Sequence, residues 1–338
     1  MEYKRIAIDT SKHVFTLHGV DEQERTVLRR ELKRGQMERF FAALAPTQVV
    51  LEACGGSHHW GRVLSGLGHQ VRLISPHYVK PFVKRGKNDR NDAEAISEAA
   101  ARPSMRAVPI KTADQQAQMM ILRHRQMLVS QRTQAINALR GHAAEFGVIA
   151  AKGCSNVADL LHSLAQNTDI PPTARAIFAQ MGTYISELDA KLGAVGKQLA
   201  ELHKQNPVSR LLAEIPGVGP LIAITMALSV TPADFTSGRH FAAWLGLTPK
   251  ERSTGGKQRM GRISKAGNQR LRQLLVTGAM AVIRFAKPGS KSASAWLLAL
   301  LERKPRKLAA VALANKMARI IWAMMARGEA YRRTPIQA

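Results

Sequence analysis

Short apolar runs alternate with polar segments over the first hundred residues, and this pattern predicts strands and helices in turn. The runs are rich in β-branched residues, which is typical of strands, and amphipathic stretches separate them. The predicted elements are strands at 5–9, 14–20 and 26–28, a helix at 36–44, a strand at 48–52, a helix at 57–67 and a strand at 70–75. The N-terminal part of the chain is therefore expected to be an α/β domain.

Two long helical stretches follow this part. In the first, at 114–146, the apolar residues Leu122, Val129 and Ile136 recur every seven residues, with arginines between them. In the second, after Pro171-Pro172, apolar residues recur at steps of three and four: Phe178, Met181, Ile185, Leu188, Leu192, Val195, Leu199 and Leu202. Such spacing buries one stripe against a partner helix. The partner is either the first stretch, in an intramolecular hairpin, or a second chain, which the sequence favours slightly.

After Asn206-Pro207 the chain is predicted to be mostly helical. Gly217 and Gly219 form a Gly-x-Gly turn before an apolar helix at 221–228, as in a helix-hairpin-helix motif. The free N–H groups of such a turn suit a phosphate oxygen, but an ordinary turn between packed helices would have the same sequence.

Three domains are expected from these patterns. The first, at 1–112, has the order of strands and helices of an RNase H-like α/β domain. The second, at 113–205, is a helical coiled-coil region that serves oligomerisation. The third, at 206–338, is a mostly α C-terminal domain with the helix-hairpin-helix-like motif.

The charge of the chain narrows its class of partner. The 338 residues include 50 Lys+Arg against 24 Asp+Glu, a net charge of +26, and 45% of them are hydrophobic. That hydrophobic content is enough for a folded core, so nucleic acid rather than disorder accounts for the charge. No uninterrupted apolar run approaches the roughly 18 residues of a spanning helix, so no membrane is expected. With only Cys54 and Cys154, a thiolate zinc site is excluded and the cytoplasm is the expected location.

Four carboxylates are the first candidates for chemistry. Asp9 and Glu52 each end a predicted strand, and an RNase H-like order of elements places those strands side by side. Asp89 and Asp92 are three residues apart, so both leave the same face of a helix. Convergent oxygen ligands bind Mg²⁺ or Mn²⁺, and a two-metal site can clamp a scissile phosphate. Taken singly, each acid is as well explained as a turn former or a helix cap.

The second candidate is Ser253, in a basic segment of the C-terminal domain. Between Lys250 and Arg272 the chain has eight basic residues and one acid, Glu251. Ser253 begins a Gly-rich stretch that is expected to be a loop, on which a hydroxyl and backbone donors can approach a phosphate. A serine nucleophile needs a base or a metal, and no neighbour in the sequence obviously supplies one.

On these residues alone, a loop that only grips nucleic acid is the better interpretation. Thr254 and Ser264 are competing hydroxyls. The expected contacts to nucleic acid are Gly217, Gly219, Lys250, Arg252, Gly255, Gly256, Lys257, Arg259, Arg262 and Lys265.

Several motifs along nearly the whole chain resemble those of the IS110 family of insertion-sequence transposases, which is related to the pilin-gene invertase. The N-terminal motifs are Ile8-Asp9-Thr10-Ser11-Lys12, Leu51-Glu52-Ala53 and Lys87-Asn88-Asp89-Arg90-Asn91-Asp92-Ala93. The C-terminal motifs are Ile215-Pro216-Gly217-Val218-Gly219, Phe241-Ala242-Ala243-Trp244-Leu245-Gly246-Leu247-Thr248-Pro249, Ser253-Thr254-Gly255-Gly256-Lys257 and Ser264-Lys265-Ala266-Gly267. Ordered motifs at compatible distances are more specific than any one alone.

The resemblance implies a RuvC-like domain with a DEDD metal site at Asp9, Glu52, Asp89 and Asp92. It implies that Ser253 attacks DNA to form a covalent phosphoserine link, with the metal activating the serine. It further implies a structured non-coding bridge RNA that pairs with donor and target DNA, and a homo-oligomer, a dimer or tetramer, whose active site draws on two chains. The expected location is the bacterial cytoplasm, at the nucleoid.

Two other functions remain as alternatives to an RNA-guided serine transposase. A RuvC-like metal-dependent junction nuclease would use water as nucleophile and would not need Ser253. A non-catalytic nucleic-acid-binding protein would keep only the basic surface, and the intact acids and Ser253 argue against it. A covalent protein–DNA adduct distinguishes the transposase from the nuclease.

Overall fold

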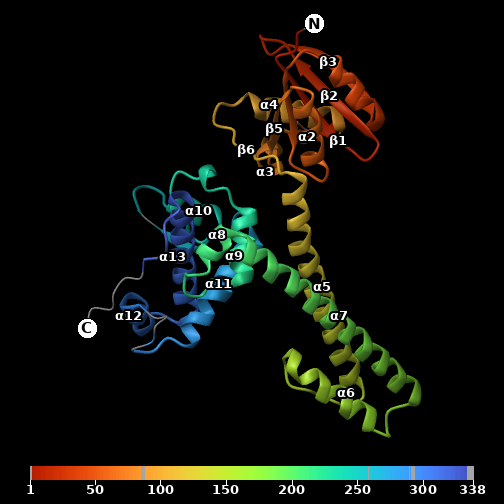
Figure 1. Ribbon diagram of the computed structural model, residues 1–338, viewed down its shortest axis with the longest axis vertical. Coiled ribbons are helices and arrows are strands. Elements are labelled where there is room, and N and C mark those ends of the chain that lie inside the picture. Colours follow the sequence, from red (N-terminus) through yellow and green to blue (C-terminus); the bar gives the residue numbers. More distant parts are fainter. Residues whose placement is uncertain (1, 85–87, 258, 289, 291–293, 333–338) are drawn as a thin grey trace. The chain divides into compact units, whose positions relative to one another are not determined.

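The computed structural model describes residues 2–84, 88–257, 259–288, 290 and 294–332 (Figure 1). Lys87, which begins one of the N-terminal motifs, lies outside these residues. Contacts within the chain divide it into two compact units, Met1–Ala117 and Gln118–Ala338. Each unit has hydrophobic clusters of its own and is therefore a folded body in itself.

The first unit is an α/β domain, as predicted (Figure 1). Its strands are β1 (Arg5–Thr10), β2 (Val14–Val20), β3 (Thr26–Lys33), β4 (Gln48–Glu52), β5 (Gln70–Ile74) and β6 (Ala107–Val108). Its helices are α1 (Met37–Ala42), α2 (Ser57–Gly66), α3 (Pro76–Val79) and α4 (Asp89–Ala101). Every strand and helix predicted up to residue 75 is present, and α3 and the two-residue β6 are additions that the sequence pattern did not predict.

The strands form one mixed sheet, in the order β3-β2-β1-β4-β5-β6 over the described residues. β1, β2 and β3 pair antiparallel, whereas β1, β4 and β5 pair parallel. The pairing of β1 with β4 runs as far as Ile8 beside Leu51. Asp9 and Glu52 come next in each strand, so both lie at the same edge of the sheet.

Alternation along the strands decides which face these two acids share. Ile6 and Ile8 of β1 pack in a cluster with residues of α1 and α2, whereas Ala7 packs on the opposite face with α4. Because successive side chains point to opposite faces, Asp9 lies on the α4 side with Ala7. By the same rule Glu52 shares the α4 side with Val50, which belongs to that cluster.

Helix α4 is fixed over the sheet by apolar packing and by two buried or half-buried arginines. Ile96 and neighbouring alanines of α4 are buried against the sheet. Arg5, only 3% exposed, donates from Nε to the Ser97 hydroxyl at 3.2 Å. Arg72 of β5 donates to the carbonyls of Ala100 and Met105, at 3.3 and 3.0 Å. These bonds hold both the middle and the C-terminal end of α4, and therefore set where its first turn lies.

The second unit is mainly helical, again as predicted (Figure 1). Its elements are α5 (Ala113–Glu145, which begins in the first unit), α6 (Val157–Gln166), α7 (Pro172–Gln205), α8 (Pro207–Leu212), α9 (Pro220–Ser229), α10 (Gly238–Trp244), β7 (Pro249–Glu251), β8 (Met260–Ile263), α11 (Gln269–Arg284), α12 (Ala295–Arg303) and α13 (Arg306–Arg327). The sequence pattern did not predict α6, β7 or β8, and it covered α10, α12 and α13 only by the expectation of a mostly helical domain.

The apolar seam of α7 is buried within the chain. Leu188 and Val195 pack with Leu128 of α5, and the same cluster reaches Ile224 of α9. Arg132 of α5 also donates to Asp189 of α7 at 2.5 Å. The intramolecular hairpin, one of the two alternatives that the spacing allowed, is therefore present. The slight preference for self-association is not needed to explain the seam and stays a prediction.

Helix α13 lies at the centre of the C-terminal core. Ala314, Met317 and Ile321 are buried, and they pack in one cluster with residues of α9, α10 and α11. Among the described residues, α13 is the helix that is long and apolar enough to cross a membrane by length and composition. Its burial in the core accounts for that composition without a membrane.

Candidate active site

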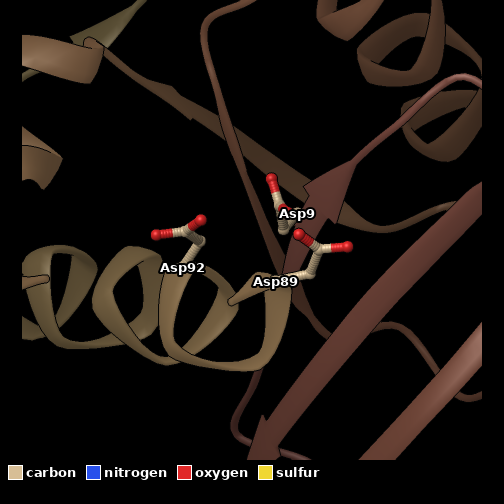
Figure 2. Close-up of side chains that lie close together, drawn as sticks. All are labelled: Asp9, Asp89 and Asp92. Atoms are coloured by element: carbon tan, nitrogen blue, oxygen red, sulfur yellow. The ribbon is translucent and has the colours of Figure 1, made fainter. Parts of the chain in front are cut away.

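Three of the four predicted acidic ligands come together at the end of β1. The carboxylates of Asp9, Asp89 and Asp92 each offer an oxygen, and these oxygens lie within 4.8 Å of one another. Figure 2 shows Asp9 at the end of its strand and the other two on the first turn of α4. Their spacing makes this possible, because residues three apart on a helix share a face. Asn88 caps the helix by accepting a hydrogen bond from the Asn91 N–H at 2.8 Å.

The fourth acid, Glu52, lies outside this group of three, but the charge of Asp92 still affects its pKa. Burial raises the pKa of Glu52 above its usual value, and the charge of Asp92 raises it further. Glu52 follows Leu51, which pairs with Ile8, so β4 places it beside the end of β1. The carboxylates thus gather at one edge of the sheet.

The crowding of negative charge is most evident at Asp9. Burial first, and then the charges of Asp89, Asp92 and Glu52, raise its pKa to about 6. A group of carboxylates that disfavour one another's ionisation is stabilised by a divalent cation, and hard oxygen ligands are those that Mg²⁺ and Mn²⁺ prefer. The residues present therefore fit such a metal ion.

Ser253 lies outside β7 and β8, on the tip of the β-hairpin that they form, so the expectation of a loop is confirmed for this residue. β7 and β8 pair antiparallel, and the ladder continues toward the tip as a bridge between Thr254 and Lys257. Gly255 and Gly256 have φ of +56° and +75°, which is typical of a type I′ turn and requires glycine-like freedom at both positions. The Gly-Gly pair is therefore explained by the turn as well as by approach to a phosphate.

The hydroxyl of Ser253 has two partners in the hairpin. It donates to Oε1 of Glu251 at 2.8 Å, and it accepts from the backbone N–H of Arg259 at 3.2 Å. The two competing hydroxyls differ: Ser264 accepts a long bond from the Ala266 N–H at 3.4 Å, and within the described residues Thr254 has no side-chain bond. Glu251 could not be found as a partner of Ser253 from the sequence, because a spacing of two brings the side chains together only where the backbone is extended.

The cations expected to contact nucleic acid surround this serine. Lys250 is in β7, Arg262 is in β8, Arg252, Lys257 and Arg259 lie on the tip between them, and Lys265 follows β8. All of these side chains are exposed. Over the described part of the chain, none of them forms an ion pair, so their charge is available to a polyanion.

Gly217 and Gly219 occupy different environments in the turn before α9. Gly217 has a φ of +85°, and a Cβ there would lie 2.7 Å from the carbonyl oxygen of Gly278 in α11. Close packing is thus sufficient to explain this glycine. Gly219 is the N-cap of α9, with open space around its Cα. A phosphate contact at this turn stays a prediction.

Known protein families and relatives match both units. Residues 6–147 match the family model DEDD_Tnp_IS110, described as a transposase, and residues 209–294 match the transposase IS116/IS110/IS902 family. A protein of Sinorhizobium fredii, y4pF/y4sB, is 51% identical over 336 residues, which are 99% of this chain and 87% of the relative. The transposase for insertion sequence element IS1111A of Coxiella burnetii is 40% identical, over 98% of this chain and 92% of its own.

These matches place the chain among the transposases, enzymes that recombine DNA. The transposase for insertion sequence element IS1328 of Yersinia enterocolitica agrees, at 36% identity over 96% of this chain and 98% of its own. The chain belongs to the IS110/IS116/IS902 family of transposases. The resemblance found in the sequence motifs is thereby confirmed.

Proposed function

We propose that this transposase cuts and rejoins DNA through a covalent phosphoserine intermediate at Ser253, assisted by a divalent metal ion. The observation that carries the proposal is the convergence of Asp9, Asp89 and Asp92 in a chain that also exposes a serine on a cationic hairpin. Asp9, Glu52, Asp89 and Asp92 would hold Mg²⁺ or Mn²⁺ in a RuvC-like, RNase H-like domain. The strand order, with three antiparallel strands followed by two parallel ones, supports that fold.

The chain's own residues account for most of the proposed reaction. The cations of the hairpin, Lys250, Arg252, Lys257, Arg259, Arg262 and Lys265, would neutralise a phosphate and orient it. The Ser253 oxygen would then form a bond to phosphorus as a sugar oxygen leaves. Attack by the sugar hydroxyl of another DNA end would release the serine and rejoin the strand. A bound metal ion would supply Lewis-acid polarisation of the phosphate.

We also propose that sequence specificity is delegated to a structured non-coding bridge RNA that pairs with donor and target DNA. The hairpin supports this, because most of its charged side chains are cations, which suit contact with the backbone better than the reading of many bases. The two glycines Gly217 and Gly219 are proposed as a further backbone contact. A location in the bacterial cytoplasm, at the nucleoid, follows from these partners.

Assembly into a dimer or tetramer is a further part of the proposal. On the helical pair, the side chains of Met127 in α5 and of Ile177 and Tyr184 in α7 are exposed to 49%, 48% and 45%. Apolar side chains outside the intramolecular seam are available to a second chain. We propose that the coiled-coil region at 113–205 serves this assembly, between a metal-binding domain at 1–112 and a serine domain at 206–338.

The alternative is a RuvC-like nuclease that uses water, and one experiment separates the two. Labelled DNA, the non-coding RNA of the element and Mg²⁺ are incubated with wild type, Ser253→Ala or Thr254→Ala, and products are resolved on a denaturing gel. The proposal predicts a protein–DNA adduct that is lost only in Ser253→Ala. Cleavage by both variants without any adduct would favour the nuclease, and an adduct lost only in Thr254→Ala would move the nucleophile to the neighbouring residue.

A further inference from the structure

The hydroxyl of Ser253 is held on two sides by its own hairpin. Its proton points to the Glu251 carboxylate, at 2.8 Å between oxygens, and the Arg259 N–H donates to it at 3.2 Å. A hydroxyl has one proton and two lone pairs. With the proton given to Glu251 and one lone pair taken by Arg259, one lone pair is left for attack on phosphorus.

Strand geometry brings the two side chains together. Glu251 is the last residue of β7, and Ser253 is two residues further along. In an extended chain, residues two apart lie on the same face. The Arg252 N–H bonds to the Arg259 carbonyl at 2.8 Å, which keeps the chain paired between these two residues. The contact is therefore built into the hairpin itself.

A carboxylate at this place opposes the charge of the surface around it. Glu251 is the one acid between Lys250 and Arg272, among eight basic residues. Its negative charge repels the phosphate that those cations attract, so binding of nucleic acid alone does not explain it. Within the described residues it forms no ion pair with any cation, and its side chain accepts a hydrogen bond from Ser253.

We propose that Glu251 is the general base of Ser253. As the bond from Ser253 Oγ to phosphorus forms and the bond from phosphorus to the sugar oxygen breaks, the proton of the hydroxyl passes to Glu251. The leaving sugar oxygen takes a proton from water. When the strand is rejoined, the attacking sugar hydroxyl gives its proton to the hydroxide left from that water, and the departing serine oxygen takes its proton back from Glu251. This inference rests on the proposed function, since it takes Ser253 as the nucleophile.

The assignment also gives the serine a local activator. A base two residues away acts within one chain, whichever chain supplies the metal ion. It further distinguishes Ser253 from Thr254 and Ser264, since neither has a carboxylate acceptor over the described part of the chain. The metal ion is then required for the phosphate rather than for the serine proton.

The test is the rate of adduct formation by the full-length protein with DNA, the element's RNA and Mg²⁺, in wild type, Glu251→Gln, Glu251→Asp and Ser253→Ala. Glu251→Gln keeps a hydrogen-bond acceptor but cannot take a proton. General bases contribute roughly 100-fold to 10,000-fold, so we expect the rate to fall at least about 100-fold. Glu251→Asp keeps a carboxylate and should recover part of the rate.

Controls separate catalysis from binding and folding. Glu302→Gln changes the charge equally at another exposed acid, on α12, and should keep the wild-type rate. DNA binding by Glu251→Gln should equal or exceed that of wild type, because a repulsive charge is gone. Since Glu251 is exposed, its variants should unfold at the wild-type temperature.

The outcomes for the inference and for the proposed function differ. In one outcome, Ser253→Ala forms no adduct and Glu251→Gln forms it at a rate within about twofold of wild type. Loss of a general base would slow the reaction by roughly 100-fold or more, so Glu251 would not be the base, and the serine mechanism would stand. If Ser253→Ala still forms the adduct, the nucleophile has been misassigned and the inference fails with it. Loss of the adduct in Ser253→Ala together with a slow Glu251→Gln supports both.

Discussion

At the scale of single residues, the crowding of carboxylates around Asp9 lowers the stability of the metal-free fold at neutral pH. Asp9 has a pKa raised to about 6 by burial and by the acids around it. The ordinary pKa of an aspartate side chain is 3.8, so the folded protein holds this proton more tightly than the unfolded chain does. The stability that protonated Asp9 contributes to the fold is fully present below pH 3.8 and is lost as the pH rises through about 6. In the absence of a metal ion, the ionised Asp9 therefore weakens the fold at neutral pH.

Replacement of Asp9 by asparagine should reveal this cost. With a chelator present, we expect Asp9→Asn to be more stable than wild type at pH 7.5, by about 1 kcal/mol once solvent screening of a half-buried group is considered. At pH 4.5 the difference should be smaller, since Asp9 is then neutral in the folded protein although it is still partly ionised in the unfolded chain. Thermal unfolding at both pH values measures the difference.

Addition of Mg²⁺ or Mn²⁺ provides the second half of this test. A ligand that binds the folded state raises its stability, so wild type should gain and Asp9→Asn should gain much less. Strand cleavage should be lost in the variant. A variant less stable than wild type at pH 7.5 without metal would contradict the view that charge crowding is relieved by the ion.

The four acids of the proposed metal site could be predicted from the sequence, whereas Glu251, the proposed base, could not, and the reason is physical. Two strand-ending acids and two acids three apart on a helix have positions fixed by backbone periodicity alone, and the structure places Asp9, Asp89 and Asp92 together. The bond between Glu251 and Ser253 depends on an extended backbone between them. Without knowing that this stretch is a hairpin, their spacing of two carries no information.

At the scale of secondary-structure elements, the turn before α9 is set by its contact with α11. The carbonyl of Gly217 lies so close to Gly278 that a Cβ on Gly278 would be 2.1 Å from it. Two glycines therefore face each other where the turn crosses the helix. This close approach joins α9 to α11 in the C-terminal core, which also supports the hairpin that precedes α11.

A matched pair of substitutions tests this packing. Gly217→Ala must place a Cβ 2.7 Å from a backbone oxygen at a positive φ, and we expect it to lower the free energy of unfolding by about 2–4 kcal/mol. Gly219→Ala has a φ of −77° and open space, and should cost less than about 1 kcal/mol. Denaturant unfolding of both variants gives the comparison. Equal losses would mean that the turn is not packed as described.

Element prediction succeeded for the long buried seam of α7 and failed for the exposed strands β7 and β8, and it also missed the short helix α6, which buries Val157, Leu160 and Leu164. The apolar seam of α7 could be predicted because residues such as Ile185 and Leu188 recur once per helical turn on the face that packs against a partner. The period does not identify the partner, since it is the same for a helix of the same chain and for a helix of another. The strands β7 and β8 are exposed, and their charged residues have no buried face to impose an alternation. Their pairing depends on the Gly255-Gly256 turn instead.

At the scale of the whole molecule, the net charge of +26 is distributed over cations with different roles. Some are neutralised: Arg25 bonds to Asp21 at 2.9 Å, and Arg132 bonds to Asp189. Arg272 is 9% exposed and donates to the carbonyls of Leu245 and Ala266, so it has a structural role. Only cations such as Arg252, exposed and without an ion pair in the described residues, are expected to displace counterions from nucleic acid.

Salt dependence of DNA binding can distinguish these roles from net charge alone. The logarithm of the association constant falls linearly with the logarithm of salt, by about 0.9 for each phosphate neutralised. Arg252→Ala should lower that slope by roughly 0.9 and weaken binding to all sequences alike, because it removes a backbone contact. Arg25→Ala removes the same charge from a guanidinium that already bonds to Asp21, and should leave the slope unchanged. Equal changes of the slope in both variants would show that overall charge, and not the hairpin, determines DNA binding. The hairpin around Ser253 would then not be the surface that binds the phosphate.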